Sequence, residues 1–102
     1  MIPIVPAPVG LGIGDPVNFS VDGTAAILTN SNENEYNGLW DGTGVVPVNT
    51  GRPVTWTGHG FTEPFLYLST TGTWVTAAEG TNPVIGLQVI DQNRVLAVSI
   101  PG

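Results

Sequence analysis

The sequence predicts an all-β fold, either a small β-barrel or a sandwich of short antiparallel strands, with an extended N-terminal arm. Short apolar runs alternate with turn signals rich in Gly, Pro and Asn, and no stretch repeats apolar residues at the spacing of an amphipathic helix. The 102 residues include 14 Gly and 9 Pro, but 41% are hydrophobic, which is enough for a packed core. We therefore expect a single domain over residues 14–102, preceded by an arm over residues 1–13.

The N-terminal arm is apolar and interrupted by prolines, which favour an extended, polyproline-like backbone. Bulky apolar side chains are poor choices for a solvated tail. We therefore expect the arm to be bound, either as an edge strand of its own domain or on a neighbouring subunit. The side chains that would make these contacts are Ile2, Pro3, Ile4, Val5, Pro6, Pro8 and Val9.

The strands of the domain follow from apolar runs between turns. Asp22 and Gly23 form a two-residue hairpin signal between strands expected at 17–21 and 24–29. A Gly-x-Pro-Val-x-aromatic pattern occurs at 14–19 and again at 51–56, and its proline suits the opening of a strand because it has no amide to donate. At most one helical turn is expected, near residues 33–39. Further strands are expected at 45–48, 53–57, 65–69 and 74–77.

The clearest hairpin is the last one, with strands at 84–90 and 95–100. In its second strand, Leu96, Val98 and Ile100 alternate with Val95, Ala97 and Ser99, which is the pattern of a half-buried strand. We expect one set to face the core together with one set from the first strand, while Gly86 and Gln88 point away. The predicted core-facing residues are Ile85, Leu87, Val89, Leu96, Val98 and Ile100.

Composition excludes several classes of function. The net charge is −6, and Arg52 and Arg94 are the only cationic side chains, so the chain lacks the positive charge needed to bind nucleic acid or an anionic membrane. It has no Cys, no Lys and one His, which leaves little for thiol, covalent or acid–base catalysis. We expect a binding or structural protein rather than an enzyme, with no cofactor and no metal.

Two polar features are candidates for catalysis or metal binding. His59 lies between two glycines, and Asp41 or Glu63 is a carboxylate that could orient it, but a loop histidine is the default interpretation. Residues 30–38 carry oxygen-bearing side chains at alternate positions, and a calcium site is conceivable with the candidate ligands Asn32, Glu33, Asn34, Glu35 and Asp41. Glu35, however, stands where the turn glycine of an EF-hand belongs. A solvated polar loop is the favoured interpretation of this segment.

Three tryptophans, Trp40, Trp56 and Trp74, form a substantial aromatic set for a small domain. Exposed indoles can stack on sugars, whereas a small β-domain uses large aromatic side chains first in its core or at a subunit interface. Core or interface is the favoured role of these three side chains, and carbohydrate binding is the alternative.

The C-terminal third carries a recognisable pattern. Residues 67–75 read as a strand, a turn with Gly and a Trp-Val pair, residues 83–86 read Pro-Val-Ile-Gly, and residues 95–102 form a Val-containing terminal strand. This pattern resembles the small β-barrel decoration, or cement, proteins of tailed-phage heads. The resemblance implies a trimer that binds the major capsid protein on the outer surface of the virion and has no catalytic residues.

The arm would then bind the capsid or a neighbouring subunit. The N-terminus lacks the basic region and the unbroken apolar stretch of a secretory signal, so we expect synthesis in the host cytoplasm. The alternative function is a carbohydrate- or receptor-binding β-module of a phage head fibre or tail appendage.

Overall fold

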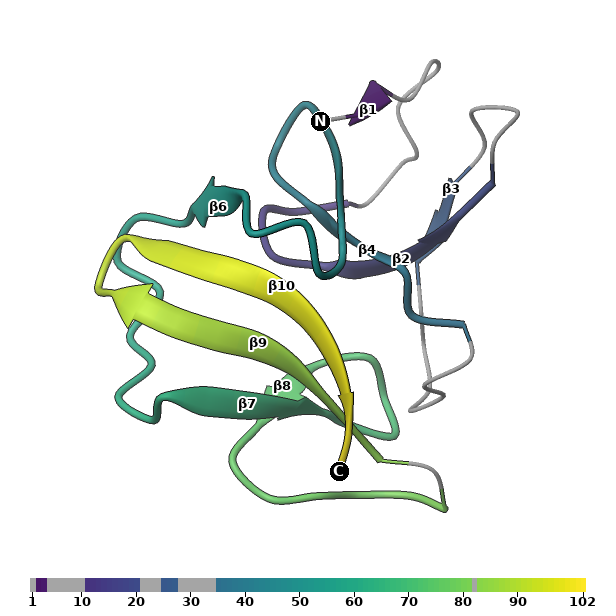
Figure 1. Cartoon of the computed structure of the whole chain (residues 1–102), viewed down its shortest axis with the longest axis vertical. Coiled ribbons are helices and arrows are strands. Elements are labelled where there is room, and N and C mark those ends of the chain that lie inside the picture. Colours follow the sequence, from purple (N-terminus) through teal and green to yellow (C-terminus); the bar gives the residue numbers. More distant parts are fainter. Residues whose placement is uncertain (1, 4–10, 21–24, 28–34, 82) are drawn as a thin grey trace.

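The computed structural model describes residues 2–3, 11–20, 25–27, 35–81 and 83–102, and these residues form strands and loops without a helix (Figure 1). The first sheet has the strand order β1-β5-β4-β2-β3 and the second has the order β6-β10-β9-β7-β8, with antiparallel pairing throughout. The strands are β1 (Ile2–Pro3), β2 (Pro16–Phe19), β3 (Ala25–Ile27), β4 (Gly38–Trp40), β5 (Gly44–Pro47), β6 (Pro53–Thr55), β7 (Phe65–Leu68), β8 (Trp74–Val75), β9 (Val84–Asp91) and β10 (Arg94–Pro101). The all-β prediction is confirmed, and the arrangement is consistent with a small β-sandwich.

The main core lies between the two sheets. Leu39 and Val46, which pair across β4 and β5, contribute from the first sheet. They pack with buried residues of the second sheet, namely Val54, Leu66, Leu87, Val95 and Ala97. Each sheet therefore buries one face against the other, as an antiparallel sandwich does.

The opposite face of the first sheet is also buried. Trp40 pairs with Val45, and together with Val17 they form a second cluster whose members are at most 4% exposed. Leu11 and Phe19 pack against this cluster. The first sheet is thus covered on both faces, which explains why all three residues of β4 are buried.

The repeated Gly-x-Pro-Val-x-aromatic pattern opens two strands, as predicted. Pro16 begins β2 and Pro53 begins β6. The valine that follows is buried in both cases, with Val17 and Val54 no more than 1% exposed. The other predicted strands are found within one or two residues of their expected bounds.

The hairpin predicted around Asp22 and Gly23 is present, but its register differs. A two-residue turn at these positions would place Phe19 opposite Ala26, whereas Phe19 pairs with Ala25. The connection between the paired residues therefore contains an odd number of residues. The turn itself lies outside the described residues.

The final hairpin is present as predicted, but its turn is shorter than the expected connection over residues 91–94. Asp91 pairs with Arg94, so only Gln92 and Asn93 form the turn. The predicted core face of β10 is wrong. Val95 and Ala97 are the buried residues, whereas Leu96 and Val98 are half-buried and Ile100 is 43% exposed. Both sets of side chains on β10 are apolar, so alternation alone does not identify the inner face.

The predicted faces of β9 are also partly wrong. Leu87 is in the core and Val89 packs against it, but Ile85 faces away from the core and Gly86 is buried. The pairing with β7 shifts at this point, since Leu66 pairs with Leu87 and Tyr67 with Ile85, which leaves Gly86 without an opposite residue. Such an irregularity places two successive residues on the same side.

The helical turn expected near residues 33–39 is not found in the described part of that range. Residues 36–37 are irregular, and Gly38 begins β4 in the middle of the first sheet. β4 has only three residues and one of them is a glycine, so its sequence shows no alternation of apolar and polar residues from which a strand could be predicted. The close approach of Val45 to Gly38 accounts for the glycine, because a Cβ at this position would overlap the Val45 side chain.

Candidate binding surface

The described part of the predicted arm belongs to the first sheet. Ile2 and Pro3 form β1, an edge strand that pairs with Val45 and Gly44 of β5. The remaining predicted contact residues, Ile4, Val5, Pro6, Pro8 and Val9, lie outside the described residues. For these residues, docking on another subunit or on a capsid stays a prediction.

The three tryptophans pack inward to different extents. Trp40 is only 4% exposed, which leaves no ring face for a ligand to stack on. Trp56 is half-buried and packs edge-on against Phe61 with ring centroids 5.2 Å apart. The carbohydrate alternative therefore depends on the part of Trp56 and Trp74 that is still accessible.

Trp74 links the second sheet to the segment that leads into the first. Its indole Nε1 donates to the carbonyl oxygen of Gly14 at 2.7 Å, and its ring makes an edge contact with Tyr36 at 5.7 Å between centroids. The Tyr36 hydroxyl in turn donates to the carbonyl oxygen of Gly86 at 2.8 Å. These contacts favour a structural role for Trp74.

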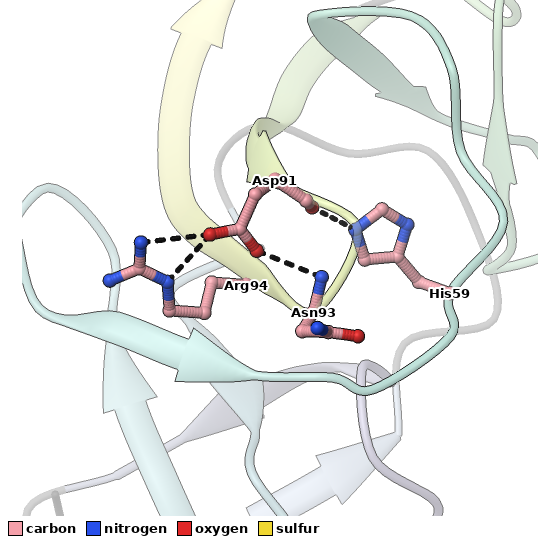
Figure 2. A network of polar contacts seen from close by, with 4 residues as sticks. All are labelled: His59, Asp91, Asn93 and Arg94. Atoms are coloured by element: carbon pink, nitrogen blue, oxygen red, sulfur yellow. Dashed lines mark hydrogen bonds and ion pairs between the residues drawn. The ribbon is translucent and has the colours of Figure 1, made fainter.

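His59 ties its loop to the turn between β9 and β10, as Figure 2 shows. Its Nδ1 accepts a hydrogen bond from the backbone amide of Phe61 at 3.0 Å, so Nε2 carries the proton and donates to the carbonyl oxygen of Asp91 at 2.5 Å. Both ring nitrogens are thus engaged with backbone groups, the arrangement of a structural histidine. Neither nitrogen is left to activate a nucleophile in this arrangement.

The same turn is held by the Asp91 side chain (Figure 2). Its Oδ1 accepts from the Asn93 amide at 2.8 Å, and its Oδ2 lies 2.8 Å from Nη2 of Arg94. The hydrogen bond from Asn93 and the guanidinium of Arg94 lower the pKa of the Asp91 carboxyl. Arg94, one of the two cationic side chains, is therefore engaged in a local ion pair.

The acidic segment considered for calcium is only partly described, because residues 30–34 lie outside the described residues. Asp41, at the end of the candidate set, accepts at Oδ1 from the amides of Thr43 and Gly44 at 2.9 and 2.8 Å, which is a turn-stabilising role. Within the described part of the chain, no three His, Asp or Glu side chains are grouped so that they could hold a metal ion.

The outward-facing side of the second sheet carries a surface that was not predicted from the sequence. Two cross-strand rows define it, and we call it the outer face. The first row is Pro53, Leu96, Gln88 and Phe65, and the second is Ile100, Ile85, Tyr67 and Val75. The neighbours of the first row and of Tyr67 along their strands are buried core residues, so these side chains point away from the first sheet. The rest of the second row shares this side because it pairs in line with Tyr67.

The outer face is apolar and accessible. Phe65 is 42% exposed and Ile100 is 43% exposed. The sequence did hold a signal for this surface, because both alternating sets of side chains on β10 are apolar. Whichever side of β10 packs in the core, the other side therefore presents apolar side chains on the outside of the sheet.

Comparison with known proteins finds no matching protein family, no matching curated protein and no matching solved structure. Among the described residues, no helix has the length and apolar character needed to cross a membrane.

Proposed function

We propose that this chain is a non-enzymatic structural protein that binds the outside of a phage capsid and stabilises it, as a decoration or cement protein. Its partner is the major capsid protein, and its copies are grouped as trimers on the outer surface of the virion. The observation that carries the proposal is the resemblance of the C-terminal third to such proteins. The residues of that resemblance fall in β7, β8, β9 and β10, four adjacent strands of one sheet.

The arm supplies a means of attachment in this proposal. β1 lies at the edge of the first sheet and has only two residues, both of which pair with β5. An extended segment beside a sheet edge is suited to strand addition or to burial in a groove of a neighbouring protein. Full burial of a side chain such as Ile4 or Val5 contributes about 1.5–3 kcal/mol, so a short apolar arm can add substantially to a weak contact.

The chemistry of the chain supports a structural role over a catalytic one. Both ring nitrogens of the single histidine, His59, form hydrogen bonds with backbone groups, and the sequence has no Cys and no Lys. The low number of charged side chains also suits attachment through apolar contacts. Such attachment is expected to persist at high salt, because apolar burial is not screened as charge pairs are.

The test is co-sedimentation with purified undecorated heads of the virus that carries the coding sequence. We expect the full chain to pellet with the heads, and a chain lacking residues 1–9 to lose at least tenfold in affinity while keeping its near-ultraviolet circular dichroism. A double substitution, Ile4→Asp with Val5→Asp, is expected to have the same effect. Thr62→Asp, which adds charge to an exposed loop residue, is the control and is expected to bind normally.

Two outcomes would contradict the proposal at different levels. If the truncated chain decorates heads with unchanged affinity, the arm is not the attachment device. If the full chain does not sediment with heads at any salt concentration, the chain is not a decoration protein of that capsid.

A further inference from the structure

The two sheets differ in how their outward sides are covered. On the first sheet, Val17, Trp40 and Val45 are at most 4% exposed, because other parts of the chain pack over them. On the second sheet, Phe65 and Ile100 remain more than 40% exposed in equivalent outward positions. The outer face of the second sheet is therefore an apolar surface that the described part of this chain leaves partly exposed.

This apolar character is concentrated on the outer face. Four large hydrophobic side chains are exposed among the described residues, and two of them, Phe65 and Ile100, lie in the rows of the outer face. A third, Ile90, is at a register shift of β9 and has no cross-strand partner. The fourth is Ile13, in a turn before β2. Single exposed apolar residues are common, but a contiguous apolar surface on a small protein marks an interaction site.

Charge indicates the kind of partner. The two rows of the outer face carry no carboxylate and no cation, and the Asp91–Arg94 pair at the hairpin end neutralises itself. The chain as a whole has a net charge of −6, so two copies repel one another at most orientations. Contact through the outer face lets two copies meet without removing an unpaired charge from water.

The centre of the outer face is also self-complementary. Gln88 is on β9, the middle strand of the sheet, directly between Phe65 and Leu96 on the neighbouring strands. Its amide has both donors and an acceptor, so it can pair with a second amide of the same kind. Apolar side chains surround it, as they surround polar groups at the centre of many protein interfaces.

The size of the outer face sets the expected strength of association. β9 and β10 are eight residues long, or about 26 Å, and five strands at about 4.8 Å spacing span about 19 Å. The footprint is therefore at most roughly 500 Å² on each copy, compared with about 800 Å² in an interface of standard size. This area suits association that depends on concentration rather than a permanent oligomer.

From these observations we infer that the outer face is the surface through which copies of this chain associate with one another. Phe65 and Ile100 are its exposed apolar contacts, and Gln88 is its central polar group. The surface is assigned without reference to a capsid. A surface that meets its own copy closes at two copies, so this contact alone does not produce the trimer of the proposed function, and the two proposals are tested separately.

The test is the solution mass of the full chain by sedimentation equilibrium, from about 1 μM to about 1 mM. We expect the wild type to associate as concentration rises. Phe65→Glu and Phe65→Lys are both expected to weaken association at least tenfold, because each places a charge in an otherwise apolar contact. The two substitutions change the net charge in opposite directions, so a general charge effect would not produce the same result in both.

Ile13→Glu is the matched control, since Ile13 is 46% exposed but lies outside the outer face. It is expected to associate like the wild type. Ile100→Lys provides an independent variant in case Phe65 variants fold poorly, and near-ultraviolet circular dichroism checks folding in each. Association that survives all three outer-face substitutions, or that the Ile13 variant weakens equally, would overturn the inference.

Head binding is scored separately from self-association. A wild-type chain that stays monomeric to the highest concentration, yet pellets with heads, overturns this inference and leaves the proposed function standing. A chain that associates through the outer face but ignores heads supports this inference and contradicts the proposed function.

Discussion

At the irregular part of β9, one residue, Gly86, allows the strand to pack closely against the aromatic side chains of Trp74 and Tyr36. Gly86 is buried beneath Trp74 and Tyr36, and a Cβ at this position would lie 2.7 Å from Cη2 of Trp74 and 3.1 Å from Cε2 of Tyr36. Neither ring is free to move, because Trp74 donates to Gly14 and Tyr36 donates to Gly86 itself. The absence of a side chain at Gly86 is thus a packing requirement.

We therefore expect Gly86→Ala to lower the free energy of unfolding by about 1–3 kcal/mol, the usual cost of overpacking a filled core. Urea denaturation followed by tryptophan fluorescence measures the change. Gly12→Ala is the control, because a Cβ there would meet only Oδ2 of Asp15 at 3.8 Å. A loss for Gly86→Ala no larger than for Gly12→Ala would show that the aromatic pair can shift aside.

Among the elements, β10 has an edge that is only partly paired. β6 covers it at Arg94, Val95 and Leu96, and beyond that point Asn49 takes the place of a neighbouring strand. The amide of Asn49 donates to the carbonyl oxygen of Ala97 at 2.9 Å, and its side-chain Oδ1 accepts from the amide of Ser99 at 3.1 Å. Asn49 has φ of 61°, a left-handed conformation that Asn tolerates better than most residues.

Two substitutions separate the contributions of Asn49. Asn49→Gly keeps the left-handed backbone but removes the acceptor for Ser99, and we expect a loss of about 1 kcal/mol. Asn49→Ala adds backbone strain and is expected to lose about 2 kcal/mol or more. Hydrogen exchange at the Ser99 amide is expected to accelerate in both variants. Unchanged exchange at Ser99 in Asn49→Gly would mean that the side-chain bond does not protect this edge.

The elements also show what the sequence was able to predict. Turn signals located the last hairpin and the proline-led strands β2 and β6, because these depend on local backbone chemistry. The inner face of β10 was predicted wrongly, since its choice between Val95 and Leu96 depends on which side meets the first sheet. β4 was missed because its burial comes from neighbours on both faces and not from its own pattern.

The same distinction applies to the candidate site. Apolar side chains between prolines predicted an arm, and two of its residues, Ile2 and Pro3, lie in an edge strand, while the contacts of residues 4–9 stay a prediction. The outer face was not predicted, because Phe65, Gln88 and Leu96 come from three strands and are brought into one row only by pairing. Residues on separate strands give no common signal until the register is known.

At the scale of the whole molecule, composition limits how stability depends on pH. The chain has no Lys and no Cys, so the side chains that most often complicate the alkaline range in other proteins are missing. Tyr36 is 3% exposed, and burial raises the pKa of its hydroxyl above the ordinary value of 10.0. The folded protein therefore keeps this proton at a pH where the unfolded chain has lost it.

The sign of the effect follows from linkage. Below about pH 10 Tyr36 is neutral in both states and its contribution to stability is fully present, whereas above that pH ionisation favours the unfolded state. We expect the free energy of unfolding to fall by up to about 1.4 kcal/mol for each pH unit above 10 until the folded-state pKa is reached. Tyr36→Phe is expected to cost about 1 kcal/mol at pH 7, through loss of the bond to Gly86, but to show a shallower alkaline decline. Urea denaturation of both chains at intervals from pH 7 to about pH 12 measures this difference, and equal slopes above pH 10 would show that Tyr36 does not control alkaline unfolding.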